Sequence, residues 1–207
     1  YKKEEFDKFY KIAYSSFDFI LLLAIPVVIG VLSFSSILVD FLGGSAFVSS
    51  VLTVEILSLT ILFSNLNALL ITPILTVMNR EKAVLKIFII ALIFNVITNM
   101  LLIPVMDFNG SALVTVLTEG IICILSLISI KSVFNVRRLF KNLFQYLVAS
   151  IFIIVVKIVI SQYVSSTYII FISTALLSAI LYFLTLILLR NELVSQLIIE
   201  VRKKIYR

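Results

Sequence analysis

The chain has 207 residues and a net charge of +6; 62% of its residues are apolar and 14% are charged. Soluble domains carry roughly 45–50% apolar and about 25% charged residues, so this composition, with a mean hydropathy of +1.22, excludes an ordinary soluble domain and indicates a membrane protein. The chain has no histidine and a single cysteine, Cys123, which excludes an internal disulfide, a Cys/His zinc site and histidine-based acid–base chemistry within it.

The N-terminal segment, residues 1–18, has the spacing of an amphipathic helix. Its apolar side chains recur every three or four residues, at Phe6, Phe9, Tyr10, Ala13, Tyr14 and Phe17. We expect a cytoplasmic lead-in helix at the inner headgroup boundary, either as a general surface anchor or as a site for anionic lipid. No signal peptide is recognisable, and because the chain begins with Tyr1 rather than Met we expect a fragment of a longer protein.

Six apolar segments follow, each long enough to cross a bilayer as a helix of about 20 residues. They cover residues 19–39, 51–76, 87–106, 109–130, 143–162 and 167–189. Each is expected to be helical, because an open strand would leave backbone groups unpaired in lipid. The predicted fold class is therefore an all-α membrane protein: a six-transmembrane-helix bundle at residues 19–189, followed by a basic cytoplasmic tail at residues 190–207.

Positive charges divide the connections between these spans into two classes. All but one of the 17 Lys and Arg residues precede span one, separate spans two and three or four and five, or follow span six. The remaining connections, around residues 40–50, 107–109 and 162–167, contain none. This is the positive-inside pattern, and with six crossings it places both termini in the cytoplasm. Because the pattern accounts for the net charge, we expect no nucleic-acid partner.

Local signals add detail to this outline. Pro26 and Pro73 are expected to kink spans one and two, either for packing or for gating. Gly110 begins span four with small residues and should allow close helix approach. The linker at residues 134–147 and the tail are predicted to be amphipathic helices. The tail's apolar positions are Leu193, Leu197, Ile198, Val201 and Ile205.

Three charged residues lie inside the predicted spans: Glu55, Glu119 and Lys157. A charge near the bilayer centre costs about 2.5–3.5 kcal/mol on insertion scales, so such residues usually face a cavity or a partner. Lys157 is expected either to reach the outer interface with its long side chain or to pair with Glu55 or Glu119.

Four asparagines lie in spans two and three: Asn65, Asn67, Asn95 and Asn99. Asn95 and Asn99 are four residues apart and share a helix face. An amide inside a membrane needs a hydrogen-bond partner, so these residues either join helices or contact a polar substrate. The sequence contains no phosphate-binding glycine loop, acidic magnesium cluster or nucleophile–base pair, so we expect no enzyme activity, catalytic residue, metal site or cofactor.

The stretch from Asn95-Val-Ile-Thr-Asn99 to Leu-Leu-Ile-Pro104, followed by Gly110-Ser-Ala112-Leu-Val-Thr115 and Glu119, resembles a motif of a known family. It is similar to the C-terminal half of bacterial polysaccharide-biosynthesis flippases, in the multidrug/oligosaccharidyl-lipid/polysaccharide exporter superfamily. That family has two asparagines, Leu-Ile-Pro, a short loop, and Gly-Ala-Ala leading to Ala-Thr. Here Ser111 and Val114 replace two of the alanines.

The resemblance implies one lobe of a two-lobe exporter in the bacterial inner membrane, with the N-terminal lobe of the same protein as its partner. It implies a flippase that moves undecaprenyl-diphosphate-linked oligosaccharide through the membrane lipid for O-antigen, lipopolysaccharide or capsule synthesis. Its cavity candidates are Glu55, Asn65, Asn67, Asn95, Asn99, Glu119 and Lys157. A multidrug/cation antiporter of the same superfamily, or a non-transporting scaffold of polysaccharide assembly, is the alternative.

Overall fold

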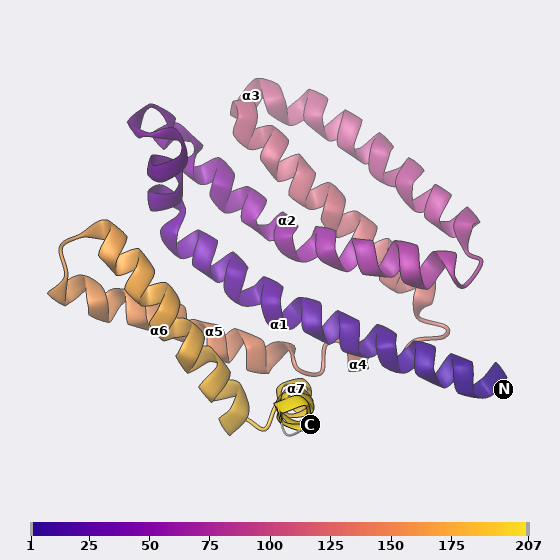
Figure 1. Cartoon of the computed structure of the whole chain (residues 1–207). Helices are drawn as coiled ribbons and strands as arrows, with labels where there is room; N and C mark the ends of the chain where they lie inside the picture. The colour runs from indigo at the N-terminus through magenta and orange to yellow at the C-terminus, as the bar shows by residue number, and fades with distance from the viewer. Residues whose placement is uncertain (1, 206–207) are drawn as a thin grey trace.

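The computed structural model describes residues 2–205, which are mostly helical and contain no strand. The helices are α1 (Lys2–Gly43), α2 (Val51–Leu69), α3 (Glu81–Ile130), α4 (Val136–Leu139), α5 (Leu143–Tyr163), α6 (Thr167–Leu188) and α7 (Glu192–Ile205). A 3-10 turn, η1 (Ser45–Ser50), precedes α2, and a π-helical turn, η2 (Leu70–Thr76), extends it. Helix α1 is central, with α2 and α3 on one side and α5 and α6 on the other (Figure 1).

Five helical stretches in the described part of the chain are long and apolar enough to cross a membrane. They are Glu5–Gly43, Ser45–Thr76, Glu81–Ile130, Val136–Tyr163 and Thr167–Leu188. The all-helical prediction is confirmed, and these helices have the length and composition of a membrane protein. Helices α5 and α6 are joined at residues 164–166, within the connection that the sequence predicts around residues 162–167.

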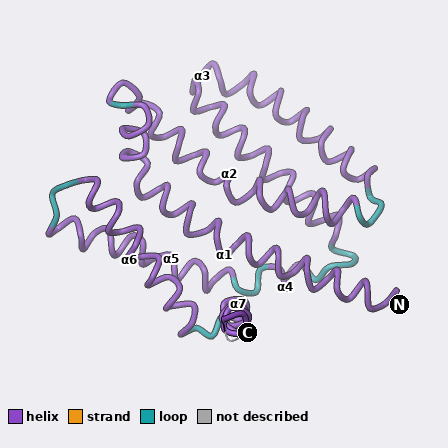
Figure 2. Tube along the Cα trace, in the orientation of Figure 1, coloured by secondary structure: helices purple, strands orange, loops and turns teal. Residues whose placement is uncertain are grey.

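Helix α3 folds back on itself, so that its two limbs run side by side in opposite directions (Figures 1 and 2). The turn is at Asp107, whose backbone is non-helical (φ 49°, ψ −134°). A Cβ atom added to Gly110 would lie 2.6 Å from the Leu102 carbonyl oxygen. Glycine is therefore needed for the close approach predicted at this position, and the limbs cover the residues of predicted spans three and four.

The break in α1 does not lie where the sequence predicts it. Pro26 lies within continuous helix, whereas Phe34 has non-helical backbone angles (φ −126°, ψ 18°). The non-helical residue thus lies eight positions after Pro26. A bend at Pro26 itself stays a prediction, because proline can kink a helix whose backbone angles remain helical. In the second span the helix is irregular at the predicted proline. Pro73 lies in the π-helical turn η2, and this wider turn accommodates the missing N–H of proline.

The lead-in part of α1 packs its aromatic stripe against protein. The ring centroids of Phe17 and Phe140 are 5.2 Å apart and those of Tyr10 and Phe134 are 5.0 Å apart, both in edge-to-face geometry. Phe17 and Phe134 are buried. The stripe predicted to face the headgroups is thus covered by the linker before α5, and the lead-in continues into the first span as one helix. Phe6 remains exposed.

The linker itself is not the continuous amphipathic helix expected over residues 134–147. It consists of a turn, the short helix α4, a second turn, and the first residues of α5. The Asn135 side chain accepts a hydrogen bond from the Arg138 main-chain N–H (3.4 Å) and begins α4. Asparagine favours such local caps over helix continuation, which explains the interruption.

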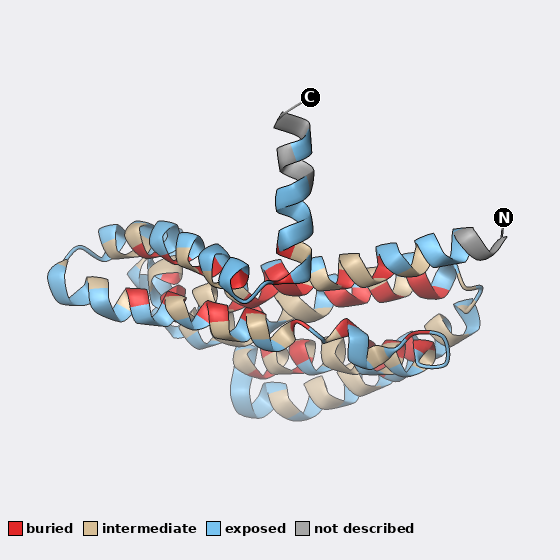
Figure 3. Ribbon diagram, turned by 90° about the horizontal axis from the view of Figure 1, so that it is seen from below, coloured by how far each residue is buried: buried red, intermediate tan, exposed pale blue. Residues whose placement is uncertain are grey.

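Helix α7 lies crosswise at the end of the bundle where α6 ends. It is seen end-on in Figure 1 and projects away from the other helices in Figure 3. Val194 is buried at its base, whereas Leu197 and Ile198 are exposed. Leu197 and Ile198 belong to the predicted apolar face of the tail, whereas the buried Val194 was not among its predicted positions. The side chains of Val201 and Ile205 lie outside the described residues.

Candidate functional site

Asn67 and Glu119 join α2 to the second limb of α3. The Asn67 amide nitrogen donates to the Glu119 carboxylate (2.6 Å) and to the Glu119 main-chain carbonyl (2.9 Å). These two acceptors fix the orientation of the amide, because a flipped amide would set oxygen against oxygen. Asn67 is only 5% exposed, and its own carbonyl oxygen has no hydrogen-bond partner among the described residues.

Asn95 and Asn99 join the two limbs of α3. The Asn95 amide donates to the Thr118 hydroxyl (3.0 Å), and the Asn99 amide donates to the Asn95 side-chain carbonyl (3.1 Å). The two asparagines therefore share the face that their spacing predicts. The Asn99 carbonyl oxygen on α3, like that of Asn67 on α2, is buried without a partner in the part of the chain that the structure describes.

Asn65 differs from the other three asparagines because it is exposed. Its amide donates back to the Ile61 carbonyl of its own helix (2.6 Å). It belongs to an exposed stripe along α2 and η2, made up of Ser64, Asn65, Ala68, Thr72 and Thr76. Hereafter these five residues are called the α2 stripe. A polar, exposed surface of this kind inside an apolar span needs water or a further protein surface opposite it.

Glu55 and Lys157 both contact the broken part of α1. The Glu55 carboxylate accepts a hydrogen bond from the Ser35 hydroxyl (2.7 Å). The Lys157 ammonium donates to the Ser33 main-chain carbonyl and lies 4.9 Å from the centroid of the Phe34 ring. Glu55 contacts α1 from α2, and Lys157 contacts it from α5. Each charge therefore has a hydrogen-bond partner on α1 next to Phe34.

The predicted pairing of Lys157 with Glu55 or Glu119 is wrong, because α1 lies between α5 and α2. Among the side chains that the structure describes, the only ion pair joins Lys141 and Glu192. It lies outside the predicted spans, and the hydrogen bond from Lys141 lowers the pKa of Glu192. From the sequence, Glu55, Glu119 and Lys157 could share one site. In the structure each forms a hydrogen bond with a different partner: Glu55 with Ser35, Glu119 with Asn67, and Lys157 with Ser33.

The chain matches no protein-family model and no curated protein. Its function is therefore inferred from its own residues.

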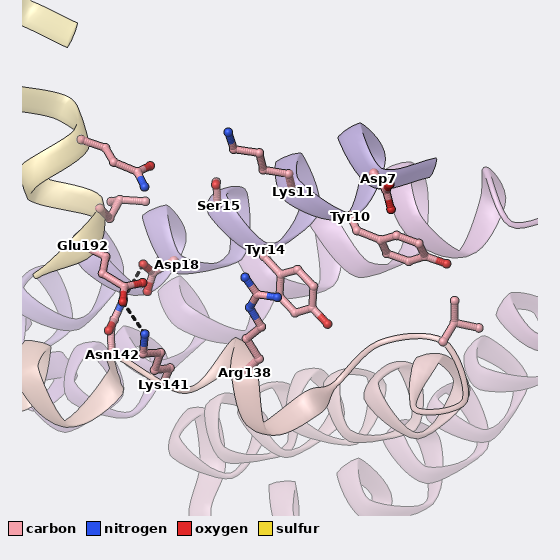
Figure 4. Close-up of a pocket in the computed structure, with 13 residues that line it drawn as sticks. Asp7, Tyr10, Lys11, Tyr14, Ser15, Asp18, Arg138, Lys141, Asn142 and Glu192 are labelled. Carbon is pink, nitrogen blue, oxygen red and sulfur yellow. Dashed lines mark hydrogen bonds and ion pairs between the residues drawn. The ribbon is translucent and has the colours of Figure 1, made fainter. Parts of the chain in front are cut away.

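Asp18 is an important polar residue that sequence reasoning missed. Its carboxylate accepts hydrogen bonds from the Asn142 amide and the Tyr146 hydroxyl, both at 2.8 Å. Asn142 and Tyr146 are buried, and Figure 4 shows Asp18 beside Asn142. The only signal in the sequence is a carboxylate at the edge of an apolar span, and nothing in that pattern identifies partners more than 120 residues away.

The chemistry of these groups is that of binding. Amides, hydroxyls and a carboxylate on α2 and α3 donate and accept hydrogen bonds without a nucleophile–base pair among them. The side-chain oxygens of Asn67 and Asn99 are buried within the described chain, whereas the α2 stripe exposes the amide of Asn65 and the hydroxyls of its serine and two threonines. Such groups suit a ligand rich in hydroxyls.

Proposed function

We propose that the chain crosses the membrane six times and forms one lobe of an exporter that flips a lipid-linked oligosaccharide across the bacterial inner membrane. A straight helix as long as α3, 50 residues, would measure about 75 Å, whereas the hydrocarbon core is about 30 Å thick. The turn at Asp107 gives each limb a length suited to one crossing. Counting the limbs separately puts every basic connection on one side, which supports cytoplasmic termini.

The observation that carries the proposal is the α2 stripe. With this orientation α2 runs inward, so the stripe occupies the inner half of the second span. Asn65 would be costly against lipid, and no helix of the described chain covers it. A second lobe facing this side across a water-filled cavity would supply polar surroundings along the whole stripe.

The same residues favour a sugar-containing substrate. Asparagine amides and threonine hydroxyls can form hydrogen bonds either with water or with the hydroxyl groups of a sugar, so one partner readily replaces the other. The undecaprenyl chain would stay in the bilayer while the oligosaccharide passes along the cavity. Of the candidate residues, we expect Asn65 to contact the oligosaccharide directly, because its side chain is exposed. Lys157 is engaged by Ser33, so a role for Lys157 with the diphosphate would require that contact to open.

The test uses the full-length, two-lobe protein in a strain whose surface polysaccharide depends on it. Asn65→Leu should strongly reduce export while the amount of folded protein stays unchanged, because the Asn65 amide bonds only its own helix. Asn65→Gln keeps an amide and should retain export. Wild-type export in Asn65→Leu, and also in its combination with Thr72→Val, would contradict the proposed cavity.

Two other outcomes would redirect the functional assignment. Drug resistance on expression, without any effect on polysaccharide, would favour a drug/cation antiporter. Purified protein in liposomes that fails to flip a fluorescent lipid-linked oligosaccharide, although cells lacking the protein lose their polysaccharide, would favour a scaffold of the assembly machinery. The proposal predicts flipping in liposomes and its loss in Asn65→Leu.

A further inference from the structure

A polar hollow of about 580 Å³ lies where α1, the linker around α4 and the start of α7 meet (Figure 4). Its walls come from three segments that are far apart in the sequence. Lys11, Tyr14 and Asp18 come from α1, Arg138 and Lys141 from the linker, and Glu192 from α7. Because Asp18 borders the first predicted span, the hollow lies at the level expected for lipid headgroups on the cytoplasmic side.

The charges in this hollow are unequally satisfied. Glu192 is paired with Lys141, and Asp18 is held by hydrogen bonds from Asn142 and Tyr146. Lys11 and Arg138 form no ion pair with any described side chain. The lining carboxylate left over is Asp7, which is exposed. Two cations are thus available to an anionic group.

Arg138 is also held in position. Its guanidinium carbon lies 4.9 Å from the centroid of the Tyr14 ring, and the Tyr14 hydroxyl accepts a hydrogen bond from the Asn135 main-chain N–H (2.8 Å). Figure 4 shows the Arg138 side chain rising from α4 beside Tyr14. A guanidinium stacked on a fixed ring keeps its N–H groups free for a phosphate.

A second hollow, of about 620 Å³, adjoins the first along the junction of α1 and α7. Both hollows are lined by Lys11, Ser15, Leu193 and Gln196. The second adds apolar side chains: Ile12, Phe19 and Ile20 of α1, and Leu197 of α7. A polar and an apolar compartment therefore meet at Lys11, which is the shape of a site for an amphiphile.

We propose that the α1–α7 junction binds a phospholipid of the cytoplasmic leaflet. Its phosphate contacts Lys11 and Arg138, and an acyl chain lies over Phe19 and Leu197. A free phosphate would use only the polar hollow, whereas a phospholipid fills both. Helix α7 lies crosswise to the other helices (Figure 3). It is therefore parallel to the membrane surface when the bundle stands upright in it, and we expect the apolar hollow to face the lipid there. This site is independent of the proposed transport cavity.

The test measures binding of phosphatidylglycerol to the purified chain in detergent, by native mass spectrometry with a titration of the lipid. Lys11→Gln and Arg138→Gln should each weaken binding about fivefold, the effect of one basic residue at a membrane surface. Lys8→Gln and Arg137→Gln are matched controls, since both residues are exposed and neither lines the hollow. The controls should change binding less than twofold.

A second arm separates the lipid from its headgroup. Leu197→Gln should weaken lipid binding, whereas Ile199→Gln, on an exposed residue of α7 outside both hollows, should not. Inorganic phosphate should bind far more weakly than phosphatidylglycerol. Equal losses in the lining and control variants, or phosphate binding as tight as lipid binding, would overturn the proposal.

Discussion

The Lys157 ammonium, on α5, donates a hydrogen bond to the main-chain carbonyl of Ser33, immediately before the residue where α1 breaks. Carbonyls at a helix break lose their regular helical donor and need another. The same ammonium lies over the Phe34 ring, where a cation–π contact strengthens as water is excluded. Lys157 therefore connects the broken segment of α1 to α5, which gives this charge within an apolar helix a structural role.

Replacing Lys157 by Met should lower the free energy of unfolding by about 1–3 kcal/mol, because the Ser33 carbonyl is left without its donor. Lys157→Arg keeps a cation with donors and should retain most of the stability. Thermal unfolding of the purified variants in detergent measures both effects. Equal melting temperatures for the wild type and Lys157→Met would show that the contact stabilises nothing.

Asn67→Leu should destabilise the packing of α2 on α3 by about 1–3 kcal/mol, since it leaves the partly buried Glu119 carboxylate without its amide donor. Asn65→Leu is the matched control, two residues away, exposed and without a bond to another helix; it should stay within about 0.5 kcal/mol of the wild type. Urea or thermal unfolding in detergent compares the two. Equal destabilisation would contradict the Asn67–Glu119 contact.

Gly110→Ala should destabilise the turn of α3, because the added Cβ would meet the Leu102 carbonyl at 2.6 Å. The limbs would have to separate, and overpacking of this kind costs typically 1–3 kcal/mol. Gly30→Ala is the control: nothing lies within 4 Å of a Cβ there, and Ala is favoured over Gly inside a helix by roughly 0.5–1 kcal/mol. Opposite shifts in melting temperature are expected; a rise for Gly110→Ala would refute the close approach.

Asp107→Gly should stabilise the protein modestly. Asp107 has a φ of 49°, which glycine adopts without the steric cost that a side chain brings. Asp107→Val should have the opposite effect, because β-branched residues tolerate positive φ poorly. Melting temperatures ranked Gly above Asp above Val are the expected result, and the reverse order would argue against the turn at this residue.

The sequence predicts the helices well because their signal is local. Apolar runs predict α5 and α6 to within about a turn, and Gly110 predicts the close approach that the α3 turn requires. These features depend on residues near one another in the chain: apolar length, small side chains and turn formers. The asparagine pair Asn95 and Asn99 also follows from spacing along one helix.

What the sequence could not supply is the order in which helices pack. Because α1 lies between α2 and α5, Lys157 meets Ser33 instead of Glu55, and no local pattern reveals this. The break in α1 lies at Phe34, a residue type that does not by itself mark a break, whereas Pro26 lies inside the helix. Asp18 was overlooked for the same reason, since its partners come from the far end of the linker.

Cysteine accessibility tests the six-crossing arrangement most directly. In a Cys123→Ser background, single cysteines are introduced at Ser45, Phe108, Ser132 and Ser165, all exposed, and intact cells are treated with a membrane-impermeant maleimide. The arrangement predicts that Ser45→Cys, Phe108→Cys and Ser165→Cys react from outside, whereas Ser132→Cys reacts only after permeabilisation. Labelling of Phe108→Cys and Ser132→Cys from the same side would mean that α3 does not cross twice, and the proposed topology would fail.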